Sequence, residues 1–197
     1  MHVSNDNAVA VLRIELLGIE PLIWRRVSVP TSMSLKAVHG VVQAVTGWLD
    51  CHLWRFEANR RKYSLLIPDD PEWNERITDA ATVKLSSLVA DGVTSTTYVY
   101  DMGDDWQHRI VIEKIAPAEP AASYPQFLGG ERRCPPEDCG GPPGYRNLLR
   151  VLADPKDPEH ASTKRWVGPR FDPERFEPAP LNKRLATLSR RANRSRR

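Results

Sequence analysis

Cysteine is scarce in this chain. The three cysteines, Cys51, Cys134 and Cys139, are an odd number, and only the last two lie close together in the sequence. Small secreted domains usually carry an even set of cysteines paired in disulfides. The cysteine usage therefore favours a reducing compartment and predicts a cytoplasmic protein.

Long apolar segments are absent as well. The apolar stretches are interrupted by residues such as Arg13, Arg25 and His39, so none reaches the ~20 residues that a membrane-spanning helix needs. The N-terminal residues also lack a basic region followed by an apolar one, which is the pattern of a secretory signal. We therefore expect no membrane partner, and we expect residues 1–8 to be disordered.

Charge is distributed unevenly along the chain. The 28 basic and 25 acidic residues give a net charge of +3 at pH 7, but residues 183–197 carry seven cations and no acid. The other 21 basic and 25 acidic residues leave residues 1–182 at −4. The sequence therefore predicts one mildly acidic folded domain over residues 9–188 and a basic disordered tail over residues 189–197.

The first half of the chain reads as strands with one helix. Leu35, Val38, Val42 and Val45 lie on one helical face, with Gly47 as a stop signal. Residues 68–82 are polar and predict a surface excursion, followed by a short helix or strand at 83–89. Alternating apolar residues and turn signals predict strands at 9–19, 22–29, 52–58, 62–67, 96–101 and 108–115.

Proline dominates the region that follows. Nine of the 17 prolines lie between Pro117 and Pro158, and proline removes a backbone donor and fixes φ. We expect an irregular segment there, with short helices at 145–152 and 181–191. The whole pattern predicts a single-domain α+β fold, in which an antiparallel or mixed sheet with a packed helix precedes a proline-rich irregular segment and short C-terminal helices.

Carboxylates and an imidazole meet in the turn between the last two predicted strands. Asp101, Asp104 and His108 can hold a divalent cation or perform acid–base chemistry. The alternative is that aspartate and glycine simply form a tight turn there, since aspartate bonds its own backbone and glycine accepts positive φ. No cofactor is certain, and a divalent metal is the candidate that these residues leave open.

The segment Cys134–Tyr145 contains a second candidate. Cys134 and Cys139 have a spacing near that of zinc knuckles, and His108 or His160 can complete the ligand set. A second tight cysteine pair is missing. The Pro-Pro and Gly-Gly elements instead favour a loop whose shape matters, either as a binding loop or as a structural one.

A third cluster combines imidazoles with indoles. His39 lies on the predicted helix, and Trp48, His52 and Trp54 follow shortly after it. These side chains either line a pocket or pack in the core.

Together these motifs resemble the plasmid pRiA4b ORF-3-like family over residues 9–188. The carrying motifs are Pro21-Leu22-Ile23-Trp24-Arg25-Arg26, Leu35-x-x-Val38-His39, Gly47-Trp48-x-x-x-His52-Leu53-Trp54-x-Phe56, Tyr100-Asp101-x-Gly103-Asp104-x-Trp106-x-His108, the Cys134–Tyr145 segment, Trp166-x-Gly168, Phe171-Asp172-Pro173-Glu174-x-Phe176 and Asn182. Met102 stands where the family more often has phenylalanine.

The resemblance implies an α+β fold and no assigned activity. Members occur on plasmids, transposons and chromosomes, and some carry the label of a transposon passenger protein of resolvase type. The resemblance adds weight to five polar positions in turns and loops as a functional cluster: Asp101, Asp104, His108, Glu137 and Asp138.

Three functions remain open at the level of sequence. The first is a non-enzymatic binding or accessory module associated with mobile elements, touching nucleic acid through tail cations Arg190, Arg191, Arg194, Arg196 and Arg197. The second is a metal-dependent hydrolase that uses Asp101, Asp104 and His108. The third is a protein–protein adaptor that uses aromatic strand faces, and in each case the partner itself is unknown.

Overall fold

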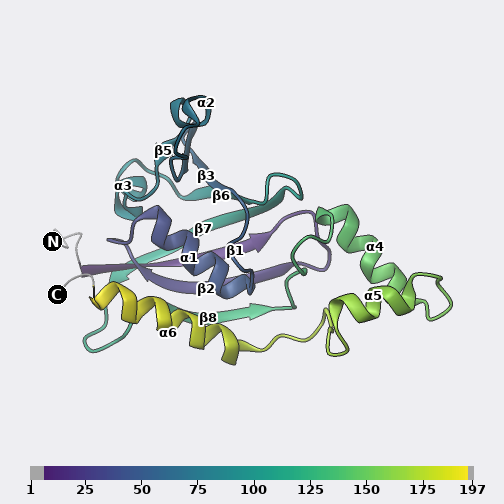
Figure 1. Ribbon diagram of the computed structural model, residues 1–197. Coiled ribbons are helices and arrows are strands. Elements are labelled where there is room, and N and C mark those ends of the chain that lie inside the picture. The colour runs from purple at the N-terminus through teal and green to yellow at the C-terminus, as the bar shows by residue number, and fades with distance from the viewer. Residues whose placement is uncertain (1–6, 195–197) are drawn as a thin grey trace.

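The computed structural model describes residues 7–194, and a single eight-stranded sheet forms its centre (Figure 1). The strand order is β5-β4-β3-β6-β7-β1-β2-β8. Neighbours are antiparallel except β4 and β5, which are parallel, so the sheet is mixed. The strands are β1 (Ala8–Leu16), β2 (Ile23–Pro30), β3 (Trp54–Ala58), β4 (Arg61–Ser64), β5 (Thr78–Asp79), β6 (Ser95–Tyr100), β7 (Trp106–Pro117) and β8 (Gln126–Glu131).

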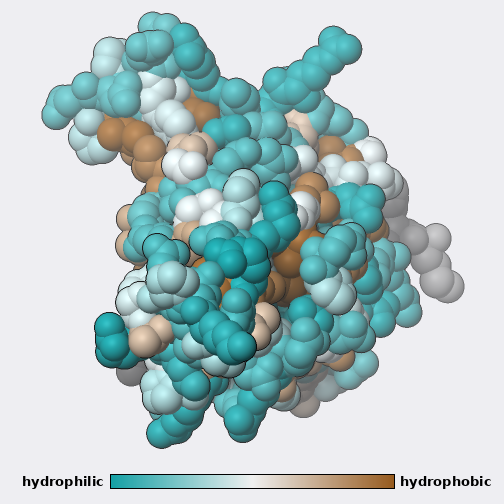
Figure 2. Space-filling model, turned by 90° about the vertical axis from the view of Figure 1, so that its right-hand side faces the viewer, coloured by the Kyte–Doolittle hydropathy of each residue, from teal (hydrophilic) through white to brown (hydrophobic). Residues whose placement is uncertain are grey.

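The longer helices lie beside this sheet. The helices are α1 (Leu35–Thr46), α2 (Pro71–Glu75), α3 (Leu85–Ala90), α4 (Gly141–Ala153), α5 (His160–Val167) and α6 (Pro178–Arg194). The α6 helix packs against α1 and β8, whereas α4 and α5 pack on each other at the far end from the termini (Figure 1). The surface at that end of the molecule is mostly hydrophilic (Figure 2). These elements confirm the predicted α+β class.

The first helix forms where its capping and apolar residues predict it. The Ser34 hydroxyl accepts the backbone N–H of Ala37 at the N-terminus, and Gly47 ends the helix with φ of 89°. Val38, Val41, Val42 and Val45 are all buried. Their apolar face packs on the sheet, where burying a side chain of this size stabilises the fold by about 1.5–3 kcal/mol.

Two elements of the proline-rich region were not predicted. Strand β8 pairs with β2, with Trp24 opposite Glu131 and Ser28 opposite Gln126. Its residues contain no proline, so their backbone N–H groups are free to bond even though prolines flank the strand. Helix α5 forms after Pro158, and no side chain caps its N-terminus, so the usual start signal is missing.

The limits of other elements also differ from the sequence prediction. Helix α4 begins at Gly141 rather than Tyr145, because Pro142 and Pro143 occupy its first turn, where a missing N–H is tolerated. The polar excursion at 68–82 contains α2 and β5. Strand β3 begins at Trp54, which leaves His52 in the preceding loop.

The predicted terminal segments are partly ordered. Ala8 begins β1, and the helix α6 continues through Arg194, so Arg190, Arg191 and Arg194 belong to a helix rather than a loose tail. Residues 1–6, Arg196 and Arg197 lie outside the described part of the chain. Within residues 7–194, no helix is both long and apolar enough to cross a membrane.

Candidate functional site

Three loops meet at one end of the sheet: residues 47–53 after α1, the β6–β7 turn at 101–105, and residues 134–140. The Leu49 N–H donates to Glu137 Oε1 (2.7 Å), and the Asp101 N–H donates to the Leu53 carbonyl (2.9 Å). The Gly140 N–H donates to Asp104 Oδ2 (3.1 Å). We call this region the loop junction. Four of the five residues of the predicted functional cluster lie in it, namely Asp101, Asp104, Glu137 and Asp138.

Asp101 shapes the β6–β7 turn. Its backbone is in the left-handed region (φ 58°), and its Oδ1 accepts the N–H groups of Gly103 (2.9 Å) and Asp104 (3.3 Å). The side chain is buried, and its other oxygen, Oδ2, lies 3.6 Å from His52 Nε2. Asp101 therefore forms the turn and also leaves one carboxylate oxygen directed at an imidazole.

The loop at 134–140 is fitted closely to this turn. A Cβ on Gly141 would lie 2.3 Å from the Asp104 carbonyl oxygen, and the φ of Gly141 is 65°. Only glycine satisfies both conditions. The Gly-Gly element, together with the Gly140–Asp104 hydrogen bond, therefore fastens the loop onto the hairpin.

Glu137 joins two other parts of the junction. In addition to the Leu49 N–H, its Oε1 accepts the hydroxyl of Tyr100 (3.1 Å), whose oxygen in turn accepts the Cys51 N–H (3.1 Å). Burial raises the pKa of Tyr100 well above its usual value, so this phenol stays protonated and donates. Trp48 stacks on Tyr100, and its indole N–H donates to the Pro135 carbonyl (2.9 Å).

His52 is the centre of the remaining polar contacts. Its Nε2 lies 3.0 Å from Asp138 Oδ1 as well as 3.6 Å from Asp101. The side chain of Asp138 is 69% exposed, so this edge of the junction faces solvent. Cys51 and Glu137 lie close enough to His52 to form a second, overlapping group of metal-ligating atoms.

Cys134, Cys139 and the other candidate histidines are not part of this group. Cys134 is buried, and its Sγ accepts a hydrogen bond from Arg25. Burial raises the pKa of Cys139 to about 12. All three cysteines are free thiols. His160 Nδ1 contacts the Val151 carbonyl on another part of the surface. His108 is fully buried against Trp48 and Tyr98, and burial lowers its pKa to about 4.

The structure therefore does not assemble the zinc set suggested by the cysteine spacing. Among residues 7–194, the groups able to hold a metal ion include none of Cys134, Cys139, His108 and His160. His108 also takes no part in a group with Asp101 and Asp104, because it points into the core from a strand while the aspartates lie in the turn.

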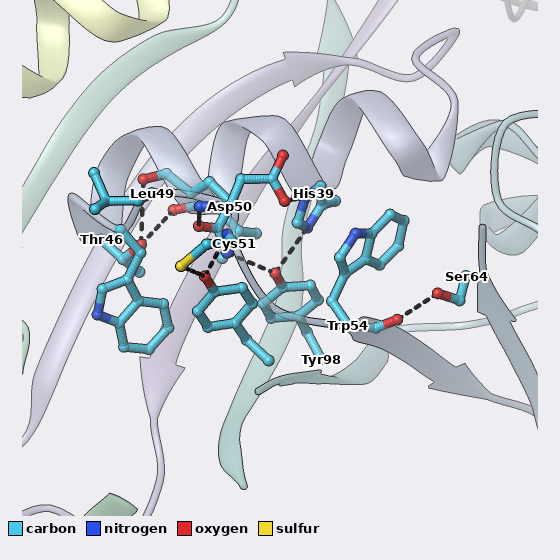
Figure 3. A network of polar contacts seen from close by, with 12 residues as sticks. His39, Thr46, Leu49, Asp50, Cys51, Trp54, Ser64 and Tyr98 are labelled. Atoms are coloured by element: carbon cyan, nitrogen blue, oxygen red, sulfur yellow. Dashed lines mark hydrogen bonds and ion pairs between the residues drawn. The ribbon is translucent and has the colours of Figure 1, made fainter. Parts of the chain in front are cut away.

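His39 and Trp54 are core residues rather than pocket residues. His39 Nδ1 lies 2.8 Å from the Tyr98 hydroxyl (Figure 3), its Nε2 lies 2.7 Å from Asp50 Oδ1, and its ring stacks on Trp54 at 3.9 Å. Gln43 Nε2 donates to the same hydroxyl (3.0 Å). Burial lowers the pKa of His39 to about 4, so the ring is neutral at pH 7.

A groove of about 740 Å³ adjoins the loop junction. It runs between the end of α1, the loop at 133–137 and the segment from Val167 to Leu181. Its lining combines aromatic rings with arginines and two acids, including Trp48, Phe171, Phe176, Arg133, Arg170 and Arg175 together with Glu137 and Glu177. Of the four predicted pocket residues, only Trp48 lines it.

The groove was not predicted as a site. Part of its lining comes from the Phe171–Phe176 motif, but the acidic and aromatic residues of that motif have no spacing that indicates a specific chemistry. Arg25 forms part of the groove wall and is 3% exposed. Its guanidinium lies over the Phe176 ring at 4.4 Å and is fully occupied by internal hydrogen bonds.

These features define the class: an α+β protein with one mixed sheet, whose loops form a polar junction beside a groove lined by arginine and aromatic residues. The chain belongs to the plasmid pRiA4b ORF-3-like protein family, whose pattern matches residues 8–180. The family prediction made from the motifs is thus confirmed.

A curated relative and a solved structure support this assignment. The uncharacterized protein y4hQ of Sinorhizobium fredii (strain NBRC 101917 / NGR234) is 39% identical over 184 residues, covering 92% of this chain and 93% of the relative. The crystal structure of MM3350 from Methanosarcina mazei Go1, a protein of unknown function, is 34% identical with a TM-score of 0.80, covering 87% of this chain and 96% of the other.

Proposed function

We propose that the protein is a non-enzymatic binding module and that the groove and the adjoining α6 helix contact nucleic acid. The observation that carries the proposal is the groove itself, where arginine side chains lie beside aromatic rings. Proteins that bind single-stranded nucleic acid combine cationic grooves with aromatic side chains on which bases stack. A role beside mobile elements is the part of this proposal that rests on the family resemblance alone.

Two groove arginines are available to an anionic ligand. Arg133 and Arg170 are exposed, and neither has a carboxylate partner among residues 7–194. The Arg133 guanidinium lies over the Phe171 ring at 5.1 Å, and its Nη1 donates to the Arg170 carbonyl at 3.3 Å. This arrangement fixes a planar cation next to an aromatic ring at the mouth of the groove.

Helix α6 extends the cationic surface from the end of the groove. Leu181 lines the groove and is the fourth residue of the helix, and no acidic residue occurs in α6. Lys183 and Arg190 are exposed on it. Arg184 has a different role, because its Nη1 donates to the Trp48 carbonyl (2.9 Å) beyond the end of α1.

Charge reversal in the groove tests the proposal. We expect Arg133→Glu combined with Arg170→Glu to weaken binding of a fluorescein-labelled single-stranded oligonucleotide by about tenfold or more, because phosphate contacts are lost and repulsion is added. The measurement is fluorescence anisotropy at about 50 and 200 mM salt, where counterion release makes affinity fall steeply.

A matched pair on the opposite part of the sheet provides the control. Arg61 and Lys62 are exposed cations on β4, far along the sheet order from β8. If Arg61→Glu with Lys62→Glu weakens binding as much as the groove pair, or if the wild-type affinity does not change with salt, the proposal is wrong. Duplex DNA measured in parallel shows whether stacking on unpaired bases contributes.

The contribution of the C-terminal cations to binding needs a truncation that keeps helix α6 packed. Deleting residues 183–197 would remove Arg184 and the buried Leu185 together with the free cations. Truncation after Arg190 keeps both contacts. It therefore measures the contribution of the terminal cations without damaging the packing of α6.

The structure does not favour the other two functions. The aromatic residues of β3 and β6 that an adaptor surface would need, including Trp54, Phe56 and Tyr98, are buried. A hydrolase built on Asp101, Asp104 and His108 would need His108 at the junction, and His108 is enclosed in the core.

A further inference from the structure

We propose that His52, Asp101 and Asp138 form a binding site for a divalent transition-metal ion at the loop junction. One imidazole nitrogen and two carboxylate oxygens of these residues all lie within 4.8 Å of one another. The site uses residues from three separate loops, and none of them lies in the arginine part of the groove. The inference goes beyond the proposed function, which needs no metal.

The spacing of the three atoms suits a bound ion. His52 Nε2 lies 3.0 Å from Asp138 Oδ1 and 3.6 Å from Asp101 Oδ2. Around an ion with bonds of about 2.0–2.2 Å, neighbouring ligands in tetrahedral or octahedral geometry lie about 3–3.6 Å apart. Both separations from the imidazole nitrogen therefore match those around a shared ion, and the two carboxylate oxygens lie within 4.8 Å of each other.

The imidazole nitrogen supplies a second and independent observation. His52 Nε2 is buried from solvent and has no hydrogen-bond partner among the described residues, although the Asp138 oxygen is only 3.0 Å away. The two groups are therefore in close electrostatic contact without forming a hydrogen bond. A buried nitrogen without a partner is unfavourable, and an ion bound in front of it would satisfy the nitrogen and both oxygens together.

The supporting contacts hold the ligands in place. Asp101 Oδ1 accepts two backbone N–H groups of its own turn, which fixes Oδ2 toward His52. The backbone N–H of Asp101 donates to the Leu53 carbonyl, next to His52. Hydrogen bonds to ligating carboxylates are a common feature of metal sites because they orient the ligand.

The donor set indicates the class of ion. One imidazole with two carboxylates suits zinc, manganese, iron, cobalt or nickel better than magnesium or calcium, which prefer oxygen ligands alone. Cys51 and Glu137 form an overlapping group with His52. Either residue is close enough to supply a further ligand, and the exposed side of Asp138 leaves room for water.

Titration calorimetry with Zn²⁺ on the full chain, after treatment with a chelator, tests the site. We expect one ion per chain, and we expect His52→Gln and Asp138→Asn each to weaken binding by at least about 10–100-fold, the range seen even for loss of a supporting residue. Asp105→Asn is the matched control, since this exposed carboxylate in the same turn bonds Gln107 instead. Its affinity should equal that of the wild type.

Two results would overturn the proposal. The first is an absence of saturable Zn²⁺ binding to the wild type, and the second is equal affinities for Asp138→Asn and the wild type. If the second result came with a loss of affinity in Cys51→Ser, the ion would belong to the overlapping Cys51 group. Because the Asp138 side chain is largely exposed, Asp138→Asn should fold even if His52→Gln does not. The absorption spectrum of bound Co²⁺ would also report the ligands directly.

Discussion

At the scale of single residues, Arg25 is the most constrained charge in the described structure. Its Nε donates to the Val45 carbonyl (2.9 Å), and its Nη1 and Nη2 donate to the Glu131 and Arg132 carbonyls (both 2.7 Å). The side chain thus joins the end of α1 to the end of β8. The planar guanidinium makes these bonds in several directions at once, which a lysine cannot do.

We expect Arg25→Met to lower the free energy of unfolding by about 2–4 kcal/mol, because several buried carbonyls lose their donor. Urea denaturation followed by tryptophan fluorescence measures the change. Arg26→Met is the control, because Arg26 is half exposed on the same strand and pairs with the Glu113 carboxylate at the surface. Equal losses for the two variants would contradict the role given to Arg25.

Helix α6 is the element whose role the sequence predicted least well. Residues 189–197 were expected to be a disordered tail, but the helix runs through Arg194 and is held by Leu181 and Leu185, both buried. The many arginines concealed an apolar face with a spacing of four residues. Because this face covers α1 and β8, the helix is part of the fold rather than an appendage.

Leu185→Ala should therefore destabilise the protein by about 2–4 kcal/mol, the usual cost of truncating a buried leucine. Thermal unfolding with denaturant titration measures it. Leu128→Ala on β8 serves as the comparison, since Leu128 is 47% exposed and should lose less than about 1 kcal/mol. If Leu185→Ala behaves like Leu128→Ala, then α6 does not stabilise the domain.

The sequence predicted the elements that have local signals and missed those that depend on distant contacts or lack such signals. Helix α1 and the β6–β7 hairpin were predictable because caps, periodicity and turn residues agree locally. Strand β8 was not, since it depends on pairing with β2, about 100 residues away in the chain. The prolines that flank it gave the opposite signal. The short helix α5 lacks a cap and has no buried residue, so neither usual indicator was present.

At the scale of the whole molecule, the sequence indicated the right loops but not which of their residues meet. Asp101, Asp104, Glu137 and Asp138 all lie in the loop junction. His108 was assigned to the cluster by its closeness in sequence, yet the alternation of strand β7 turns it into the core. His52 takes its place because the loop after α1 folds back onto the turn, a contact between distant segments that no local pattern encodes.

The two buried histidines couple the stability of the whole domain to pH. Burial lowers the pKa of both His39 and His108 from the ordinary 6.5 to about 4. The unfolded chain therefore binds more protons than the folded chain between these values, so stability is full above about pH 6.5 and falls as the pH drops toward 4. Asp50 and Tyr98, the partners of His39, do not reverse this direction.

When the pH is lowered from 7 to 5, each of the two histidines should reduce the free energy of unfolding by about 2 kcal/mol, so that the two together reduce it by about 4 kcal/mol. Urea denaturation at the two pH values measures the difference. His39→Gln should remove about half of the pH dependence, whatever its effect on stability at pH 7. A wild-type protein equally stable at both pH values would mean that neither buried imidazole is held in its neutral form.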